Sequence, residues 1–310
     1  MRVRMLAIVL VAVLGLALVT QAGARQVLLV STNTGWSKYD CATGAYLGLL
    51  PGMSATRVVV AEPGGILDVY AGNSILRYDV DSGRSLGSIS LLGYFGGCEG
   101  MTLGPDGCLY LANTYSNRIL RCDTSTGAVQ VVPLSVSITQ PFGIAFGSDG
   151  DLYACANLPN PAGWGREIGR IMLSDGSLVE KYQGTKDLQS PMQIVSTPDG
   201  SIYALNQCAF GLYKLNRAAG RFDEIVPGGP QLGFQNMAFG SGSAAFLTQY
   251  DDSTRGFTVR RYDLQTGGLS YFAPGGTGYL AIVTVPEPSG ALLLAAALGC
   301  LAGALRLRRR

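Results

Sequence analysis

The body of this 310-residue chain repeats one pattern of short apolar strands and glycine-rich turns, and no other feature constrains the fold as strongly. In the clearest copy, the turn Pro105-Asp106-Gly107 precedes an apolar strand at 108–113, and a further strand follows at 118–123. Asp-Gly suits a hairpin because glycine adopts a positive φ without steric cost. Comparable turns occur in four further units: Glu62-Pro63-Gly64-Gly65, Ser148-Asp149-Gly150, Pro198-Asp199-Gly200 and Ser241-Gly242-Ser243.

A second marker, an Asp or Asn with a Gly four residues later, gives the spacing of the units. The marker residues are Asp40, Asp79, Asp123, Asn216 and Asp263, and the fourth unit carries the variant Ser174-Asp175-Gly176. Successive markers lie 39 to about 49 residues apart, which is the usual length of a four-stranded propeller blade. The sequence therefore predicts an all-β protein, a six-bladed β-propeller.

The two ends of the repeat region predict how the ring closes. The first unit has only three strands, at 27–31, 36–40 and 45–50, whereas a spare apolar strand lies at 279–285. We expect this C-terminal strand to become the inner strand of the first blade. The resulting 1+3 strand closure covers the sheet edges and couples the two ends of the ring.

The sequence contains no histidine, and this absence narrows the possible chemistry. It excludes a Ser-His-Asp or Cys-His apparatus, a His-ligated metal and a His general base. An enzyme would have to use carboxylates, Tyr, Lys, Cys, Ser or Thr, so catalysis stays open while a non-catalytic role is favoured. Six of the 23 basic residues lie in the terminal segments, which leaves 17 against 21 acidic residues. A nucleic-acid partner, which needs clustered positive charge, is not expected.

Residues 1–24 have the three parts of a secretory signal peptide. Arg2 and Arg4 precede an apolar run of 15 residues from Met5 to Val19, and Ala22-Gly23-Ala24 has the small-x-small form of a cleavage site. We therefore expect signal peptidase to cleave before Arg25. An uncleaved anchor is the alternative, although the apolar run is shorter than the about 20 residues that a membrane span needs.

The C-terminus carries a second export-related pattern at 286–310. Pro286, Glu287 and Pro288 keep the chain extended, an apolar stretch follows at 290–305, and an arginine cluster ends the chain. These three parts in this order resemble the PEP-CTERM sorting signal, with its transmembrane sorting helix. The resemblance implies processing by an exosortase at an inner-membrane intermediate. Release or attachment at the cell surface would follow, often alongside exopolysaccharide production. A plain C-terminal membrane helix is the alternative.

Together these features divide the chain into a signal peptide (1–24), a β-propeller (25–285) and a sorting signal (286–310). The repeat at 100–113 and 117–119 resembles the NHL and SMP-30-type six-bladed propellers. Such propellers serve as binding modules, scaffolds, lyases and lactonases, so the resemblance implies a fold rather than a function. We favour a binding or scaffold module in the extracellular matrix, with exopolysaccharide or surface proteins as partners and no cofactor.

In this fold, the loops that lead into the inner strands surround one mouth of the central channel, together with the loops between second and third strands. The residues that we expect there as ligand contacts are Glu99, Asn113, Asn157, Trp164, Asn206 and Asn236. The SMP-30 resemblance implies an alternative, a metal-dependent lactonase in which Glu99, Asn157 and Asn206 hold Ca²⁺ or another divalent metal. Strand-end asparagines that only cap turns are the structural alternative. Propellers of the virginiamycin-lyase type need a histidine that this chain lacks.

Two local features complete the set of candidates. An insertion at 158–166 places Trp164 between the second and third strands of the fourth blade, where it either stacks on a sugar ring or packs locally. Apart from Cys300 in the tail, six cysteines remain, an even number that is typical of exported chains with disulfides. We expect a cross-strand disulfide between Cys108 and Cys122, and a second bond between Cys98 and Cys155 in adjacent blades.

Overall fold

The fold is seen in a computed structural model, which describes residues 24–53, 56, 58–94, 96–158, 166–184, 188, 190–206, 211–228, 233–240, 242–251 and 255–286. Most of the predicted signal peptide (1–23), Trp164 and the segment 287–310, with Glu287 and Pro288, lie outside the described residues. Among the described residues, no helix has both the length and the apolar character needed to cross a membrane. Residues Gln26–Val283 form one compact unit.

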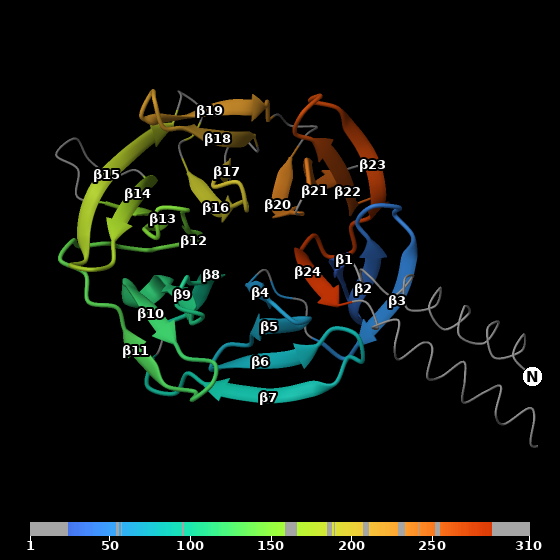
Figure 1. Ribbon diagram of the computed structural model, residues 1–310, viewed down its shortest axis with the longest axis horizontal. Coiled ribbons are helices and arrows are strands. Elements are labelled where there is room, and N and C mark those ends of the chain that lie inside the picture. The colour runs from blue at the N-terminus through green and yellow to red at the C-terminus, as the bar shows by residue number, and fades with distance from the viewer. Residues whose placement is uncertain are drawn as a thin grey trace, which may run out of the picture. The chain divides into compact units, whose positions relative to one another are not determined.

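This unit is a six-bladed β-propeller, as the repeats predicted, with the inner strands gathered around the centre in Figure 1. Each blade has four strands, named below from the inner strand outward. Blade 1 has β24 (Leu280–Pro286), β1 (Ala24–Thr32), β2 (Gly35–Asp40) and β3 (Tyr46–Pro51). Blade 2 has β4 (Val59–Glu62), β5 (Ile66–Tyr70), β6 (Ser74–Asp79) and β7 (Ser85–Ser90). Blade 3 has β8 (Cys98–Leu103), β9 (Leu109–Asn113), β10 (Arg118–Cys122) and β11 (Val129–Val131), with the short 3₁₀ helix η1 (Thr114–Ser116) after β9.

The other three blades follow the same order. Blade 4 has β12 (Ile144–Phe146), β13 (Leu152–Asn157), β14 (Arg166–Met172) and β15 (Ser177–Gly184). Blade 5 has β16 (Pro191–Ser196), β17 (Ile202–Asn206), β18 (Leu212–Asn216) and β19 (Arg221–Val226). Blade 6 has β20 (Phe234–Phe239), β21 (Ala244–Asp251), β22 (Gly256–Asp263) and β23 (Leu269–Pro274).

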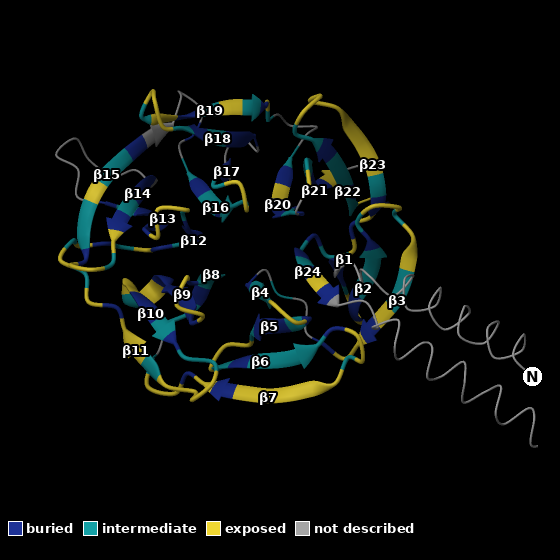
Figure 2. Ribbon diagram, viewed as in Figure 1, coloured by how far each residue is buried: buried dark blue, intermediate teal, exposed yellow. Residues whose placement is uncertain are grey.

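The second strand of each blade is largely apolar on both faces, with Asp68 of β5 as an exception, because it is sandwiched between two neighbouring blades. In β9, Leu109 and Leu111 pack in the cluster shared with blade 2, whereas Tyr110 and Ala112 pack in the cluster shared with blade 4. Side chains alternate along a strand, so a strand buried on both faces shows a continuous apolar run. Figure 2 shows the consequence, with the inner and middle strands largely buried and the outer strands β3, β7 and β23 largely exposed.

The predicted 1+3 closure is confirmed, because β24 pairs with β1 in the sheet order β24-β1-β2-β3. Ser31 is the centre of this junction. Its backbone N–H donates to Tyr279 O at 3.0 Å, and its backbone oxygen accepts from Thr277 N at 2.8 Å. Its hydroxyl accepts from Tyr279 N at 2.9 Å and lies 2.6 Å from the Thr277 hydroxyl. The junction therefore joins residues from the two ends of the ring through one buried serine.

Two of the blades are joined into one sheet, and the sequence repeat did not predict this connection. The outer strands β15 and β19 pair in parallel, with Gln183 opposite Arg221 and Gly184 opposite Phe222. Blades 4 and 5 thus share one eight-stranded sheet. The last two residues of β15 reach the start of β19 and satisfy part of an otherwise open edge.

Neighbouring inner strands contact each other in two ways. The residue at one position determines whether the contact is a close backbone approach or a side-chain hydrogen bond. Gly100 and Gly143 occupy this position in blades 3 and 4. A Cβ on Gly100 would clash with Phe142 O, just before β12, and a Cβ on Gly143 with Met192 O of β16. Gln193 and Asn236 occupy it in blades 5 and 6, and their amides reach across instead. Gln193 Oε1 accepts from Met237 N at 2.8 Å and its Nε2 donates to Met237 O at 3.0 Å.

We expect Gln193→Met to lower the free energy of unfolding by about 2 kcal/mol, because it leaves the buried backbone N–H and C=O of Met237 without partners. Urea unfolding of the full chain would measure this. Gln235→Met is the matched control, since Gln235 is an exposed glutamine on the next inner strand, and it should change stability by less than about 0.5 kcal/mol. Equal losses in the two variants would contradict the bridging role of Gln193.

A cation lies on the third strand of every blade at one register position. Each faces a residue of the second strand, and the six pairs are Lys38–Leu29, Arg77–Asp68, Arg121–Tyr110, Arg170–Tyr153, Lys214–Tyr203 and Arg261–Phe246. In blades 3 and 4 the arginine bonds an aspartate of the preceding turn, with Arg121 Nε 2.7 Å from Asp106 Oδ2 and Arg170 Nε 2.8 Å from Asp151 Oδ2. Blade 2 departs from the others because an acid, Asp68, replaces the apolar or aromatic partner.

Candidate ligand-binding site

The six inner strands enclose a central cavity of about 550 Å³. Its walls are mostly apolar, and the polar side chains that line it are Glu99, Thr102, Gln193, Ser196, Thr197 and Gln235. Among the described lining residues, Glu99 is the only one with a charged side chain. An apolar cavity with a few polar groups is the usual form of a small-ligand site, so this channel is the candidate site.

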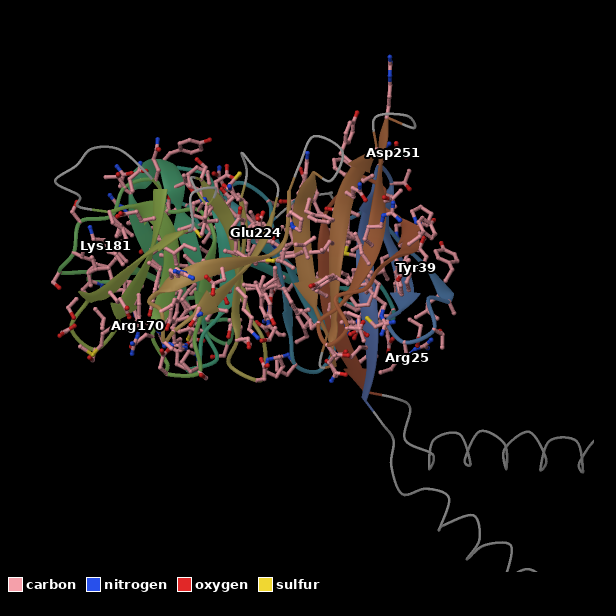
Figure 3. The ribbon with its side chains drawn as sticks, turned by 90° about the horizontal axis from the view of Figure 1, so that it is seen from above. Arg25, Tyr39, Arg170, Lys181, Glu224 and Asp251 are labelled. Atoms are coloured by element: carbon pink, nitrogen blue, oxygen red, sulfur yellow. The ribbon has the colours of Figure 1, made fainter. Side chains whose placement is uncertain are left out.

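The two faces of the ring differ in what they carry. We call the face with the loops between second and third strands the upper face; the loops that lead into the inner strands lie on it as well. In Figure 3, Asp251 at the end of β21 marks the upper face, whereas Arg170 lies toward the opposite one. Glu99 and Gln235 lie in corresponding positions near the upper-face ends of β8 and β20, where they line the cavity.

Two of the predicted contact residues, Asn206 and Asn236, have their carbonyl oxygens occupied by backbone groups. Asn206 Oδ1 accepts from Ser190 N at 3.0 Å, and Asn236 Oδ1 accepts from Leu280 N at 3.0 Å. Both side chains are buried. These bonds fix the loop before β16 to the end of β17 and join blade 6 to blade 1, so both amides have a structural role in the ring.

Asn113 and Asn157 are the last residues of β9 and β13 but differ in exposure. Asn113 is fully buried, and neither atom of its carboxamide has a hydrogen-bond partner among the described residues. Asn157 is half-buried, and its Nδ2 lies 3.4 Å from Gln140 Oε1. Of the predicted amides that the structure describes, Asn157 is therefore the one that reaches the surface of the upper face.

The donor set predicted for a divalent metal fits such an ion poorly. Ca²⁺ takes six to eight oxygen ligands, usually with several carboxylates. Here Glu99 supplies the only charge in the cavity lining, and Asn206 Oδ1 already accepts a backbone N–H. Among the described residues, no three side chains of His, Cys, Asp or Glu lie close enough to hold a metal.

The predicted disulfide between Cys108 and Cys122 is absent from the structure, where both are free thiols. The hairpin register explains the error, because Cys122 pairs with Leu109 and not with Cys108. A shift of one residue turns a side chain to the other face of the sheet, so Cys108 packs toward blade 4 and Cys122 toward blade 2.

The predicted bond between Cys98 and Cys155 is not formed either, since Cys98 is a free thiol. The two residues lie in different hydrophobic clusters, Cys98 between blades 2 and 3 and Cys155 between blades 4 and 5. Burial is the main cause that raises the pKa of Cys98 to about 12 and that of Cys122 to about 11. Neither thiol is ionised near neutral pH, so neither is a ready nucleophile.

Part of the channel and its mouth was not predicted from the sequence. Gln193 and Gln235 belong to the segments that the sequence placed at this mouth, and both line the cavity. Tyr115 was missed. It lies on η1 with 70% of its surface exposed, and only its position in the chain after a predicted strand end pointed to the upper face.

Comparisons with known proteins find the fold but no family. No protein-family model matches the sequence, and no curated protein matches it. Among solved structures, a chain from the nidogen/laminin complex is similar with a TM-score of 0.64 at 15% identity, over 85% of this chain and all of that one. Virginiamycin B lyase from Staphylococcus aureus is similar with a TM-score of 0.54 at 18% identity, over 82% of this chain and 85% of that one.

A catalytically inactive histidine-to-alanine variant of the same lyase, solved with quinupristin, is similar with a TM-score of 0.54 at 19% identity, over 82% of this chain and 86% of that one. At such identities the likeness concerns the fold and carries no activity across. The chain is thus a six-bladed β-propeller, and its solved structural neighbours share this fold.

Proposed function

We propose that this chain is an exported, non-catalytic propeller that binds a hydroxyl-rich polymer at the cell surface or in the extracellular matrix. The observation that carries the proposal is the lining of the central cavity, where neutral hydroxyl and amide groups outnumber a single carboxylate. Amides donate and accept hydrogen bonds at any ordinary pH, which suits sugar hydroxyls. General acid–base catalysis, by contrast, needs a titratable side chain positioned at the reacting group, and among the described lining residues only Glu99 is of that type.

The chain ends support export. The signal-peptide pattern at 1–24 implies cleavage by signal peptidase, and the motif Pro286-Glu287-Pro288 with the apolar segment and arginine cluster resembles a PEP-CTERM signal. On this interpretation, an exosortase processes an intermediate held in the inner membrane. The propeller is then released or attached outside the cell, where exopolysaccharide and surface proteins are its available partners.

The structural neighbours are consistent with binding and argue against lyase chemistry. The nidogen/laminin structure has a chain of this fold in a complex between two proteins. The lyase, however, is catalytically inactive when one histidine is replaced by alanine, and this chain has no histidine at all. We therefore do not propose lyase activity for it.

A lactone hydrolase that uses a divalent metal is the second candidate, favoured only by the position of Glu99 in the cavity. Among the described lining residues Glu99 would be its one charged ligand, so the cavity fits this candidate poorly. Such an enzyme should lose activity both with chelator and with Glu99→Gln. A binding module should have no activity that either treatment removes.

Export is tested by the intact mass and fractionation of the protein from producing cells with and without their exosortase. We expect a species that starts at Arg25, ends near Pro288 and is found outside the inner membrane only when the enzyme is present. A full-length tail in both strains would overturn the sorting proposal and leave an ordinary membrane-anchored propeller.

Binding is tested with the mature protein on immobilised exopolysaccharide purified from the producing cells. We expect saturable retention that Gln235→Ala weakens about threefold to tenfold, since Gln235 is an exposed amide at the cavity. Ser125→Ala, in a turn between β10 and β11, is the control and should have no effect. The absence of retention for the unmodified protein would contradict the proposed function.

A further inference from the structure

An exposed tyrosine stands on a rigid support on the upper face of blade 3. Tyr115 is 70% exposed, and a Cβ on Gly97 would lie 3.1 Å from its ring carbon Cε2, so the ring rests against this glycine. The neighbouring Thr114 is buried and fixes η1 in place. Its N–H donates to Gly97 O at 3.0 Å and its hydroxyl donates to Pro141 O at 2.6 Å. The aromatic ring is therefore held in position while most of its surface faces solvent.

A row of amides continues from this tyrosine toward blade 4. Asn117, directly after η1, accepts a hydrogen bond from Gln140 N through its Oδ1 at 2.9 Å. Gln140 Oε1 in turn lies 3.4 Å from Asn157 Nδ2. We call Tyr115, Asn117, Gln140 and Asn157 the blade 3–4 rim. It is uncharged, and it combines an aromatic ring with several hydrogen-bonding groups that retain free donor or acceptor capacity.

The backbone of Gln140 is held in an unfavourable conformation. Its φ is +48°, in the left-handed region that non-glycine residues other than Asn and Asp rarely adopt. Such conformations persist only where surrounding contacts enforce them, and they gather at ligand sites. Here the bond from Gln140 N–H to Asn117 Oδ1 holds the backbone, and Asn157 contacts the Gln140 side chain. A glycine would take this conformation freely, but it would lack the amide side chain.

The blade 3–4 rim also adjoins the cavity. Gly97, on which Tyr115 rests, is two residues before Glu99, the charged residue of the cavity lining. A ligand long enough to contact both would pass from the cavity mouth over the tyrosine ring. The apolar faces of sugar rings pack on aromatic rings while their hydroxyls bond amides, and a polysaccharide strand has both features along its length.

We infer that the blade 3–4 rim is a saccharide subsite, in which the Tyr115 ring stacks on a sugar unit and the Asn117, Gln140 and Asn157 amides bond its hydroxyls. This rests on the proposed function and deepens it, since it assigns the polysaccharide to one sector of the upper face. The subsite extends the channel mouth outward and accounts for the strained glutamine.

The test uses the mature protein and immobilised exopolysaccharide purified from the producing cells. Tyr115→Ala should weaken retention about tenfold without changing the melting temperature, because the ring is exposed and makes few core contacts. Tyr271→Ala is the matched control, since Tyr271 is 58% exposed on the outer strand β23, far along the chain from the rim. It should leave retention unchanged.

A second variant separates a binding role from a structural one. Gln140→Gly relieves the left-handed strain, so its melting temperature should stay the same or rise, while retention falls severalfold. If Gln140 had only a structural role, its replacement would not lower retention while leaving the melting temperature the same or higher.

The outcomes distinguish this inference from the proposed function. If the unmodified protein is not retained, both are wrong. If it is retained, and Gln235→Ala weakens retention while Tyr115→Ala and Gln140→Gly do not, only the rim assignment is wrong. Equal losses for Tyr115→Ala and Tyr271→Ala would also overturn the assignment, because they would indicate non-specific adhesion through exposed tyrosines.

Discussion

Replacing Asp68 with Asn is expected to stabilise the propeller at pH 8 and to remove most of its loss of stability between about pH 4 and pH 7. Asp68 is fully buried in blade 2, where the other blades have Leu, Tyr or Phe opposite the cation of the third strand. Its Oδ1 accepts from Arg77 Nε at 2.9 Å, while Arg77 Nη2 donates to Glu62 Oε2 at 2.7 Å. One guanidinium thus serves two carboxyl groups.

Two carboxyl groups, Asp68 and Glu62, share the single positive charge of Arg77, so this cluster would carry an excess of negative charge if both were ionised. Asp68 Oδ2 and Glu62 Oε1 are both buried, and neither has a hydrogen-bond donor among the described residues. Burial first, and then the Glu62 carboxylate, raise the pKa of Asp68 to about 7 against the opposing effect of Arg77. The folded chain therefore keeps a proton on Asp68 at pH values where the unfolded chain has lost it.

The direction of the pH effect follows from this difference in bound protons. Between the unfolded pKa near 4 and the folded pKa near 7, the native state binds more protons, so stability falls as pH rises. The stability lost across this range is on the order of a few kcal/mol. Asparagine is neutral at every pH, accepts from Arg77 and can donate to Glu62, so Asp68→Asn should keep the low-pH stability at high pH.

Urea unfolding of both proteins from pH 4 to pH 9 would measure the effect. The difference between their free energies of unfolding should grow from pH 4 to pH 7 and then level off. Asp106→Asn is the contrasting control. Although burial opposes it, hydrogen bonds from Arg121, Cys108 N–H and Tyr110 lower the pKa of Asp106, so its loss should weaken the protein at neutral pH. A pH profile of Asp68→Asn parallel to that of the unmodified protein would contradict a neutral Asp68.

The second large effect is expected from Gly143→Ala, which should lower the free energy of unfolding by about 3 kcal/mol. A Cβ at this position would lie 2.6 Å from Met192 O and 2.8 Å from Gln193 Cα and Ile194 N. All three atoms belong to the backbone of β16, so no side chain can rotate away. The methyl group would have to force the inner strands of blades 4 and 5 apart.

Thermal or urea unfolding measures this loss, and Gly242→Ala provides the control. A Cβ added at Gly242 would have no atom within 4 Å, so alanine fits there without a clash. It should be neutral, or slightly stabilising because alanine lowers the conformational entropy of the unfolded chain. If Gly143→Ala unfolded at the same urea concentration as Gly242→Ala, the close approach of β12 and β16 would not be a feature of the native protein.

Local sequence patterns were sufficient for much of the fold. The Asp-Gly turns set the hairpins, and the recurring Asp or Asn marker gave six units with a spare strand at the C-terminal end. These features depend on neighbouring residues along the chain, and the structure confirms the six blades and the 1+3 closure. The fully buried second strands were also predictable, because contact with a blade on each face demands an unbroken apolar run.

Features that depend on registers or on contacts between blades were not predictable. The predicted Cys108–Cys122 disulfide was wrong because Cys122 lies opposite Leu109, one residue along from Cys108. Even a correctly predicted hairpin does not fix which face of the sheet each side chain takes. The strand-end amides of Asn206 and Asn236 were expected to contact ligand, but their carbonyl oxygens accept backbone N–H groups, in the case of Asn236 from the next blade. The parallel pairing of β15 with β19 likewise joins two repeats that the sequence presents as separate units.

The sequence by itself determined the number of blades, their closure and the absence of histidine chemistry, because each is fixed by residue type and local spacing, whereas the export signals stay predictions. Only the tertiary structure decided which polar groups line the cavity, which amides bond backbone groups of the next blade, and that Asn117 and Asn157 both bond Gln140. The physical reason is that ring closure sets residues from different repeats side by side, and the distance between them depends on the packing of every blade in between.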